Sequence, residues 1–478
     1  MTGALYVSAA HKSSGKTTLA IGLCAALGAR GRIVQPYKKG PDYIDPLWLT
    51  AACARPCHNL DYHTMGRDEI TDLYQRAAHG ADLSLIEGNK GLFDGVAVDG
   101  SNSNAALARQ LATPIVLVLD ARGSSRGVAP LVIGYQHFDP GLWIAGVILN
   151  RVGGARHEAK LRAVLERYTD VPVWGALEDS PELTITERHL GLVPSGEWEE
   201  AQGLIERVGR AVANGVDIDA LLALSQPTIR PAPTTIPAAR PPDIRIGVAR
   251  DRAFSFYYPG DLEALERSGA RLVFIDTLHD TRLPEVDGLI IGGGFPETQA
   301  AALSANVALR AAIKDAIEAG LPVYAECGGL MYLTRRLTWQ GHSFPMVGII
   351  AADTVMEARP VGHGYARLRT QASHPWVGAG WEAADLPAHE FHYSRLVDID
   401  PNTVYAYEVA RGTGIAGHRD GIVRHNMLAS YAHLRDVAAC RWTGAFMAFI
   451  RRRRVLWGQT VGDNGMSDVG LRGPVMTS

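Results

Sequence analysis

A proline-rich stretch near the middle of the chain constrains its folding more than any other feature. Six prolines lie between Ser225 and Asp243, among small and polar residues without aliphatic periodicity. Proline fixes φ and removes a backbone donor, so such a stretch is typical of a semi-extended linker. The chain has 478 residues, too many for one ordinary domain. We therefore expect one domain over residues 1–224, a linker over 225–243 and a second domain over 244–452.

Short apolar runs alternate with helix-length amphipathic segments on both sides of this linker. Strands separated by helices indicate parallel sheets that helices cover, so we predict an α/β fold for each half, with a doubly wound parallel sheet in the first. The apolar runs are Ala4–Ala10, Ile33–Val34, Leu83–Glu87, Ile115–Asp120, Ile144–Asn150 and Val171–Leu177 before the linker, and Ile244–Ala249, Arg271–Ile275, Gly288–Ile291 and Pro322–Tyr324 after it.

Composition excludes several classes of protein. The formal net charge is −3, which provides no global field to recruit nucleic acid or an anionic membrane. The apolar runs are also too short to cross a bilayer, so we expect a soluble, cytoplasmic protein. Five cysteines are too few for a disulfide scaffold and suit a reducing compartment. After residue 452 the sequence is rich in Gly, Ser and Asp, and we expect a disordered tail over 453–478.

The start of the chain carries a phosphate-binding pattern. Gly15-Lys16-Thr17-Thr18 stands between the strand-like run Ala4–Ala10 and the apolar run Leu19–Leu27. In a P-loop, backbone N–H groups and the helix amino terminus attract phosphate, the lysine reaches the terminal phosphates and the threonine holds magnesium. Ala10 stands where the pattern begins with glycine. A structural turn is the alternative, but the strand, loop and helix context favours a nucleotide site.

Two acidic pairs follow the next predicted strands. Asp42 and Asp45 lie three residues apart beside Lys38 and Lys39, and a second pair, Glu87 and Asp94, lies among glycines. Ligands of a doubly wound sheet bind where the strands end, so these acids are candidates to hold magnesium and a substrate acid. The alternative is that each pair belongs to a solvated glycine-rich turn.

A cysteine in the second half has the context of a nucleophile elbow. Cys327 follows the apolar run that ends near Glu326 and precedes Gly328 and an apolar, helix-like stretch. A tight turn there exposes the thiol, and the helix amino terminus lowers its pKa. The glycine loop at 292–294 can donate backbone N–H groups to an oxyanion, so we expect Gly293, Gly294 and Gly328 to form that hole.

The thiol also needs a base, and His433 follows a strand-like run about a hundred residues later. Separation in sequence is no obstacle to such a pair. His389 and His392 compete for the role, or they serve as structural or substrate-contacting histidines. Their spacing of three residues has no third ligand motif beside it, so a zinc site is not expected.

Three motifs of the first half, in order, resemble the cobyrinic acid a,c-diamide synthase family. They are Ser13–Thr18, Lys39–Pro46 and Glu87–Gly95, with Asn89-Lys90 differing from the pair found in many members. These enzymes use ATP and glutamine to convert the a and c acetates of a corrin-type ring into amides. The resemblance implies that Asp42, Asp45, Glu87 and Asp94 serve ATP, magnesium and the substrate carboxylate, with Thr17, Asp42 and Glu87 as the magnesium ligands.

The second half is similar to the class I glutamine amidotransferase domain of such synthases. Ala249–Tyr258 and Gly292–Glu297 carry this similarity, which extends to about residue 450. Ala325 replaces the first glycine of the usual elbow, and Arg435 stands where a triad glutamate follows the histidine by two residues. The resemblance therefore implies a Cys327–His433 dyad.

These patterns together predict a carbon–nitrogen ligase of two active sites. Its expected cofactors are ATP and Mg²⁺, and its expected partners are glutamine and a corrinoid polycarboxylate, with a homodimer possible and no nucleic acid or membrane. Within this class the alternative substrate is a sirohaem-type tetrapyrrole. From other classes, a P-loop ATPase of the partition or carrier type has no use for Cys327, and a pure amidohydrolase needs only the second half.

Overall fold

The computed structural model describes residues 2–185, 187–188, 191–197, 200–224, 239–381 and 384–464. Residues 225–238 of the predicted linker lie outside this set, and 239–243 have no regular secondary structure. The chain divides into two compact units, one of Met1–Pro237 with Phe256–Gly260 and one of Ala238–Ser255 with Asp261–Ser478.

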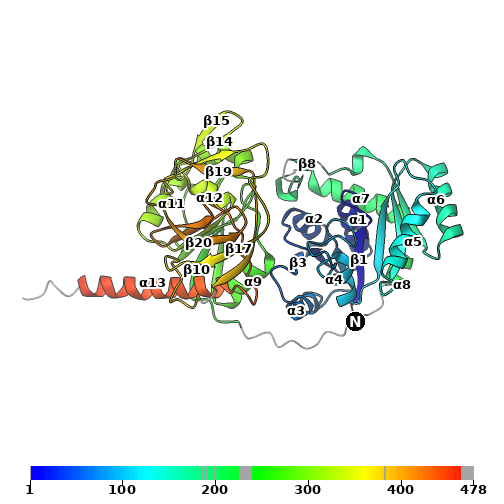
Figure 1. Cartoon of the computed structure of the whole chain (residues 1–478). Coiled ribbons are helices and arrows are strands. Elements are labelled where there is room, and N and C mark those ends of the chain that lie inside the picture. Colours follow the sequence, from blue (N-terminus) through cyan, green and yellow to red (C-terminus); the bar gives the residue numbers. More distant parts are fainter. Residues whose placement is uncertain are drawn as a thin grey trace, which may run out of the picture. The chain divides into compact units, whose positions relative to one another are not determined.

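The first unit contains a seven-stranded sheet in the order β3-β2-β4-β1-β5-β6-β7, and all its pairings are parallel. Figure 1 shows this sheet flanked by helices, which is the doubly wound arrangement predicted from the alternating apolar runs. The strands are β1 (Gly3–Ala9), β2 (Val34–Lys39), β3 (His58–Leu60), β4 (Leu83–Glu87), β5 (Ile115–Asp120), β6 (Ile144–Val152) and β7 (Val173–Glu178). The helices are α1 (Lys16–Ala29), α2 (Ile44–Cys53), α3 (Arg67–Ala77), α4 (Asn104–Gln110), α5 (Val128–Phe138), α6 (Ala155–Tyr168), α7 (Ala201–Gly215) and α8 (Ile218–Leu224), with a short pair of strands, β8 (Glu187–Arg188) and β9 (Gly191–Leu192).

Helix α1 lies in the core of this unit because small residues let its neighbours approach closely. A Cβ on Gly22 would lie 2.4 Å from a methyl of Val212 on α7, and one on Gly209 of α7 would lie 2.8 Å from the Cβ of Ala25. Leu19 and Leu23 are buried on the same helix. The helix that begins at the predicted phosphate loop is therefore fixed rigidly to the rest of the unit.

The second unit contains a nine-stranded mixed sheet in the order β11-β10-β12-β13-β22-β21-β20-β17-β18. The pairings from β11 to β22 are parallel and the rest are antiparallel. Only the first part of the sheet is therefore the parallel sheet expected of an α/β fold. Its strands are β10 (Ile244–Ala249), β11 (Ala270–Ile275), β12 (Gly288–Ile291), β13 (Val323–Glu326), β17 (Gly362–Thr370), β18 (Asp385–His392), β20 (Val404–Arg411), β21 (Arg419–Arg424) and β22 (Met427–Ser430).

A smaller four-stranded sheet has the order β15-β14-β16-β19. Its strands are β14 (Arg336–Trp339), β15 (His342–Pro345), β16 (Asp353–Met356) and β19 (Ser394–Val397). The helices after residue 244 are α9 (Pro259–Arg267), α10 (Ala300–Ala305), α11 (Val307–Glu318), α12 (Gly328–Leu333) and α13 (Trp442–Asn464).

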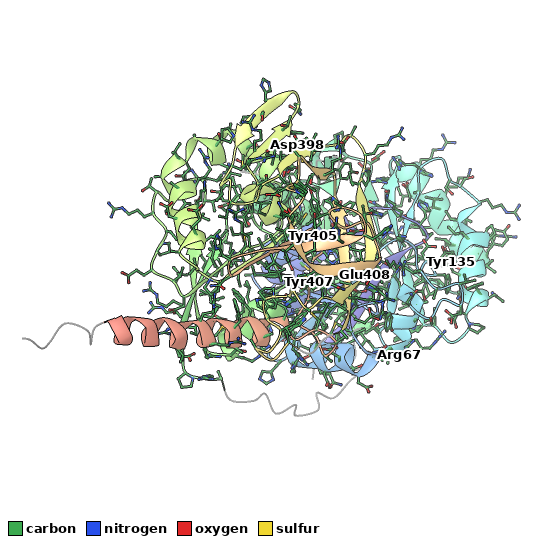
Figure 2. All side chains as sticks on the ribbon, turned by 60° about the vertical axis from the view of Figure 1, so that its left-hand side comes forward. Arg67, Tyr135, Asp398, Tyr405, Tyr407 and Glu408 are labelled. Atoms are coloured by element: carbon green, nitrogen blue, oxygen red, sulfur yellow. The ribbon has the colours of Figure 1, made fainter. Side chains whose placement is uncertain are left out.

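Strand β20 shows how the antiparallel part covers the core. Tyr407 is fully buried and its hydroxyl lies 3.0 Å from Nε2 of His374, whereas the next residue, Glu408, is exposed (Figure 2). The buried rings of Tyr324 and Trp442 pack at a centroid distance of 4.7 Å. Tyr324 belongs to β13, the strand that ends directly before the predicted nucleophile, Cys327.

Helix α13 extends past residue 452, whereas the sequence indicated that order ends there. Its basic run is paired within the second unit, since Arg451 forms an ion pair with Asp243 and Arg454 with Asp287. Arg453 also donates a hydrogen bond to the side chain of Asn426. Because these partners are distant in sequence, the basic run alone gives no sign that the helix continues. The rest of the predicted tail, 465–478, lies outside the described residues.

No helix in the described ranges has both the length and the apolar character needed to cross a membrane.

Candidate functional site

The predicted phosphate loop connects β1 to α1, and its conformation requires glycine at position 15. Gly15 has φ +87°, and a Cβ there would lie 2.0 Å from Nδ2 of Asn150. That amide donates a hydrogen bond to the carbonyl of Ser14 at 2.9 Å. On the other side the hydroxyl of Tyr135, labelled in Figure 2, donates to the carbonyl of Ala10 at 2.6 Å. Side chains therefore hold the loop through its carbonyl groups from two sides. The N–H groups of the loop and of the helix amino terminus can then serve phosphate.

Lys16 and Thr17 open helix α1, and Thr18 follows, half-buried, in the same turn. The side chain of Lys16 is only 7% exposed. Burial, together with the nearby ammonium of Lys38, lowers the pKa of Lys16 to about 8. A bound polyphosphate would supply negative charge next to Lys16 and so stabilise its charged form.

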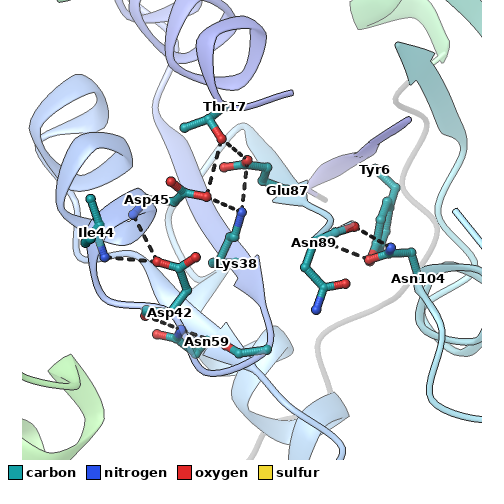
Figure 3. A network of polar contacts seen from close by, with 11 residues as sticks. Tyr6, Thr17, Lys38, Asp42, Ile44, Asp45, Asn59, Glu87, Asn89 and Asn104 are labelled. Atoms are coloured by element: carbon teal, nitrogen blue, oxygen red, sulfur yellow. Dashed lines mark hydrogen bonds and ion pairs between the residues drawn. The ribbon is translucent and has the colours of Figure 1, made fainter. Parts of the chain in front are cut away.

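Thr17 contacts two carboxylates, one at the end of β4 and one in the first turn of α2 (Figure 3). Its hydroxyl lies 2.6 Å from Oε1 of Glu87 and 3.3 Å from Oδ2 of Asp45. The ammonium of Lys38 contacts the same two oxygen atoms, at 3.0 Å from Glu87 and in a short ion pair with Asp45. Lys38 and Glu87 are opposite one another in the pairing of β2 with β4, so the sheet register brings them together.

The charges of this cluster stabilise each other. Burial opposes the charged form of Lys38, but Asp45 and Glu87 outweigh it and hold the pKa of Lys38 well above its usual value. Burial raises the pKa of Glu87, although Lys38 opposes this shift. The cluster therefore holds one ammonium between two carboxylates.

Asp42 contacts the backbone of the residues that follow it. Its Oδ1 accepts the backbone N–H groups of Ile44 at 2.9 Å and Asp45 at 3.1 Å, at the start of α2. Burial, together with the charge of Asp45, raises the pKa of Asp42 to about 7. The described carboxylates that contact Thr17 are those of Asp45 and Glu87. Asp42, which the predicted magnesium set includes, instead contacts the backbone at the start of α2, and its place in that set stays a prediction.

The loop after β4 is shaped by Asn104, which sequence reasoning did not single out. Its amide donates to the carbonyls of Asn89 at 2.7 Å and Gly91 at 2.6 Å, and its oxygen accepts the N–H of Asn89 at 3.1 Å. The hydroxyl of Tyr6 also donates to this oxygen, as Figure 3 shows. Asp94 is exposed and accepts the N–H of Gly91 at 2.9 Å, so it stabilises this loop.

The arrangement fits a magnesium ion bound together with a nucleotide. Oε2 of Glu87 is buried and has no hydrogen-bond partner among the described residues. No group of three or more His, Cys, Asp and Glu side chains in the described part of the chain is arranged to hold a metal. Two carboxylates and a hydroxyl suit Mg²⁺, which binds few protein ligands and completes its shell with phosphate oxygens and water.

Cys327 lies between β13 and α12 in a conformation rare for a residue with a side chain. Its φ is 47° and its ψ is −98°, and its N–H donates to the carbonyl of Ser430 at 2.7 Å. A Cβ on Gly329 would lie 2.1 Å from the carbonyl oxygen of Ile291, so the helix can approach the sheet only with glycine there. This strained turn between a strand and a helix is the elbow geometry expected from the sequence.

The three predicted oxyanion-hole glycines lie close to this elbow. A Cβ on Gly328 would lie 3.1 Å from the backbone nitrogen of Gly294, and Gly294 has φ +153°. A Cβ on Gly294 would lie 2.1 Å from the carbonyl oxygen of Ala253. The carbonyl of Gly293 accepts the N–H of Ser255 at 3.1 Å. Gly328 begins α12, so its N–H has no partner in the preceding helical turn.

His433 is buried beside the thiol. Burial alone would lower the pKa of His433, but hydrogen bonds to Cys327 and Glu326 outweigh it and raise the pKa to about 10. Nδ1 of His433 lies 3.3 Å from Oε2 of Glu326. Sequence reasoning missed Glu326, because it sought an acid after the histidine; the only signal was its place next to the cysteine.

The two competing histidines have other contacts. The ring of His389 is stacked on that of His433 at 4.9 Å and 14°, and the two backbones exchange hydrogen bonds. The ring of His392 is stacked on Tyr431 at 3.8 Å, and its Nδ1 lies 2.8 Å from the carbonyl oxygen of Ser394. His433 is therefore the histidine placed to exchange a proton with Cys327.

Comparison with known proteins finds a family domain in each half of the chain. Residues 7–193 match the CobQ/CobB/MinD/ParA nucleotide binding domain, and residues 245–436 match the CobB/CobQ-like glutamine amidotransferase domain. The cobyrinate a,c-diamide synthase of Magnetococcus marinus is 45% identical over 457 residues, covering 94% of this chain and 97% of that protein. Those of Methanosarcina acetivorans and Dehalococcoides mccartyi are 40% and 41% identical, covering 93% and 90% of this chain and 94% of each relative.

Fold, sites and matches define a nucleotide-binding P-loop domain followed in the same chain by a glutamine amidotransferase domain. The chain belongs to the cobyrinate a,c-diamide synthase family, and it is a glutamine-dependent, amide-forming ligase. The family resemblance, the α/β fold class and the enzyme class predicted from sequence are thereby confirmed.

Proposed function

We propose that this enzyme amidates the a and c acetate carboxylates of cobyrinate or hydrogenobyrinate, using ATP and the amide nitrogen of glutamine. The observation that carries the proposal is the pairing of a strained, histidine-bonded thiol at Cys327 with a separate P-loop in one chain. The names of the relatives supply the substrate and the positions of the two amides.

The amidotransferase site releases ammonia from glutamine. The Cys327 thiolate attacks the side-chain amide carbon, and the oxyanion is stabilised by the N–H groups near Gly294 and Gly328. His433 gives its proton to the departing nitrogen, which leaves as ammonia, and a glutamyl thioester remains on Cys327. Water, losing a proton to His433, then hydrolyses the thioester to glutamate and restores the thiol.

The nucleotide site activates the acetate. Lys16 and the loop N–H groups hold the terminal phosphates of ATP, and the acetate oxygen attacks the γ-phosphorus in line to form an acyl phosphate and ADP. Ammonia then attacks the acyl carbon and phosphate leaves, so that one amide forms for each ATP and glutamine. Thr17, Asp45 and Glu87 would hold Mg²⁺, which neutralises charge on the phosphates when bound.

Product mass tests this proposal most simply. We expect purified enzyme with ATP and glutamine to convert cobyrinate or hydrogenobyrinate to its diamide, with ADP and glutamate formed in equal amounts. Lys16→Ala should form no amide from glutamine or from ammonia. If a diamide forms only from a sirohaem-type acid, the proposed substrate is wrong and the reaction class is kept. ATP hydrolysis without amide formation from any of these acids would contradict the ligase proposal. The predicted cytoplasmic location and homodimer stay predictions.

A further inference from the structure

Glu326 is the last residue of β13 and directly precedes the nucleophile. Its side chain contacts the imidazole of His433, a residue 107 positions later in the chain. We propose that Glu326 is the positioning residue for His433, completing a Cys–His–acid triad from the nucleophile's own strand. The position two residues after the histidine, where a triad glutamate is usual, holds Arg435. This inference rests on the proposed glutaminase function of Cys327.

The carboxylate of Glu326 has a fixed orientation. Its Oε1 accepts the N–H of Leu434 at 2.8 Å and also a short hydrogen bond from the hydroxyl of Tyr324. Because two donors hold Oε1, Oε2 is turned toward Nδ1 of His433, 3.3 Å away. A carboxylate there accepts the Nδ1 proton and selects the tautomer in which Nε2 exchanges a proton with the thiol.

The sheet register explains how an acid from this strand reaches the histidine. β13 and β22 pair in parallel, with Glu326 opposite Ser430. The chain after Ser430 turns back over the end of β13, where Asp420 accepts the N–H groups of Tyr431 and Ala432, each at 3.0 Å. The turn therefore brings His433 above Glu326, and the two side chains meet in a site from which water is largely excluded.

Burial strengthens this contact. Glu326 is 8% exposed and His433 is 3% exposed, so their mutual attraction is weakly screened. The segment that follows His433 is fixed separately, because Asp261 accepts the N–H of Asp436 at 2.9 Å and the indole of Trp442 at 3.0 Å. Removing the charge of Glu326 should therefore change the state of His433 more than the position of its backbone.

Other titratable groups face the pair from several elements, and a pH profile must take them into account. His389 is stacked on His433 from β18, and Cys327 hydrogen-bonds to it from the elbow. Tyr324, Tyr407 and Cys440 interact electrostatically with Glu326, and burial raises the pKa of each well above its usual value. Because these three groups hold their protons to a higher pH than usual, they do not produce the alkaline limb that Glu326 controls.

Glu326→Gln tests the role, because it keeps the size of the side chain and removes its charge. We expect the glutaminase kcat to fall roughly 10²-fold or more, as for other triads that lose their acid, with KM for glutamine little changed. The alkaline limb of the kcat profile should move to lower pH, since His433 loses the carboxylate that keeps it protonated. Glu326→Asp should restore part of kcat, and amidation from ammonia should stay at the parent rate in both variants.

Two controls separate the possible failures. Parent kcat and pH profile in Glu326→Gln, with Cys327→Ala inactive toward glutamine, would overturn the positioning role alone. Glutaminase activity in Cys327→Ala would instead overturn the proposed function. If Glu326→Gln also loses ammonia-dependent synthesis, its fold is damaged and Tyr324→Phe decides: a severalfold loss of kcat at unchanged KM supports the role, and parent kcat contradicts it.

Discussion

At the scale of single residues, the ammonium of Lys38 is the centre of the nucleotide site. It and the hydroxyl of Thr17 contact the same two oxygen atoms, Oδ2 of Asp45 and Oε1 of Glu87. An ion pair this deeply buried is stable only while both signs are present. The contacts with Lys38 thus orient both carboxyl groups before a nucleotide or a cation binds. Asp42, which lies beside them, has a raised pKa because of burial and the charge of Asp45.

The raised pKa of Asp42 makes the free energy of unfolding depend on pH. The pKa of Asp42 is raised to about 7, above the value of an unfolded aspartate, so the folded protein holds this proton more tightly. Its contribution to stability is complete below about pH 4 and is lost as the pH rises through 7. We expect Asp42→Asn, which can still accept the hydrogen bonds at the start of α2, to become more stable relative to the parent between pH 4 and 7.

The gain should be below about 1.4 kcal/mol per pH unit, because the half-buried carboxylate keeps some contact with water. Urea unfolding of both proteins at pH 5 and pH 8 measures it. A stability difference that is the same at both pH values would contradict the assigned environment of Asp42.

At the scale of elements, both sites lie where a strand ends and a helix begins, and glycine permits each junction. β1 leads to α1 through Gly15, and β13 leads to α12 through Cys327 and Gly328. In the first the backbone adopts a positive φ beside Asn150, and in the second glycine lets α12 contact the loop at Gly294. Each junction gives a helix amino terminus directed at the place where negative charge is held or develops.

Gly15→Ala tests the first junction against a matched control on the same helix. Alanine at φ +87° is strained, and its Cβ would displace the amide of Asn150, so we expect a loss of about 1–3 kcal/mol in unfolding free energy and of nucleotide binding. A Cβ on Gly28 would meet no atom within 4 Å, so Gly28→Ala should be neutral or stabilising by about 0.5–1 kcal/mol. Titration with ATP and chemical unfolding check both; equal behaviour of the two variants would contradict the role of Gly15.

For the whole molecule, the sequence predicted those site residues that lie in a local motif, such as a strand, a loop and a helix in succession. Gly15, Lys16 and Thr17 lie in the expected strand–loop–helix junction, and Cys327 lies in the expected elbow. It did not predict contacts that depend on the register of paired strands or on long-range packing. Asp45 rather than Asp42 meets Thr17, Glu326 meets His433 across 107 residues, and Arg451 pairs with Asp243 to extend α13. The antiparallel part of the second sheet likewise follows from pairings with no local motif.

If one chain carries two separable reactions, Cys327→Ala should use two nitrogen sources differently. The substitution removes the nucleophile and leaves Lys16, Thr17 and the carboxylates unchanged. With ATP and cobyrinate, glutamine should then give no amide, whereas high ammonium at alkaline pH should still give the diamide. Normal amidation with glutamine, or loss of ammonia-dependent synthesis in a variant that remains folded, would contradict the account.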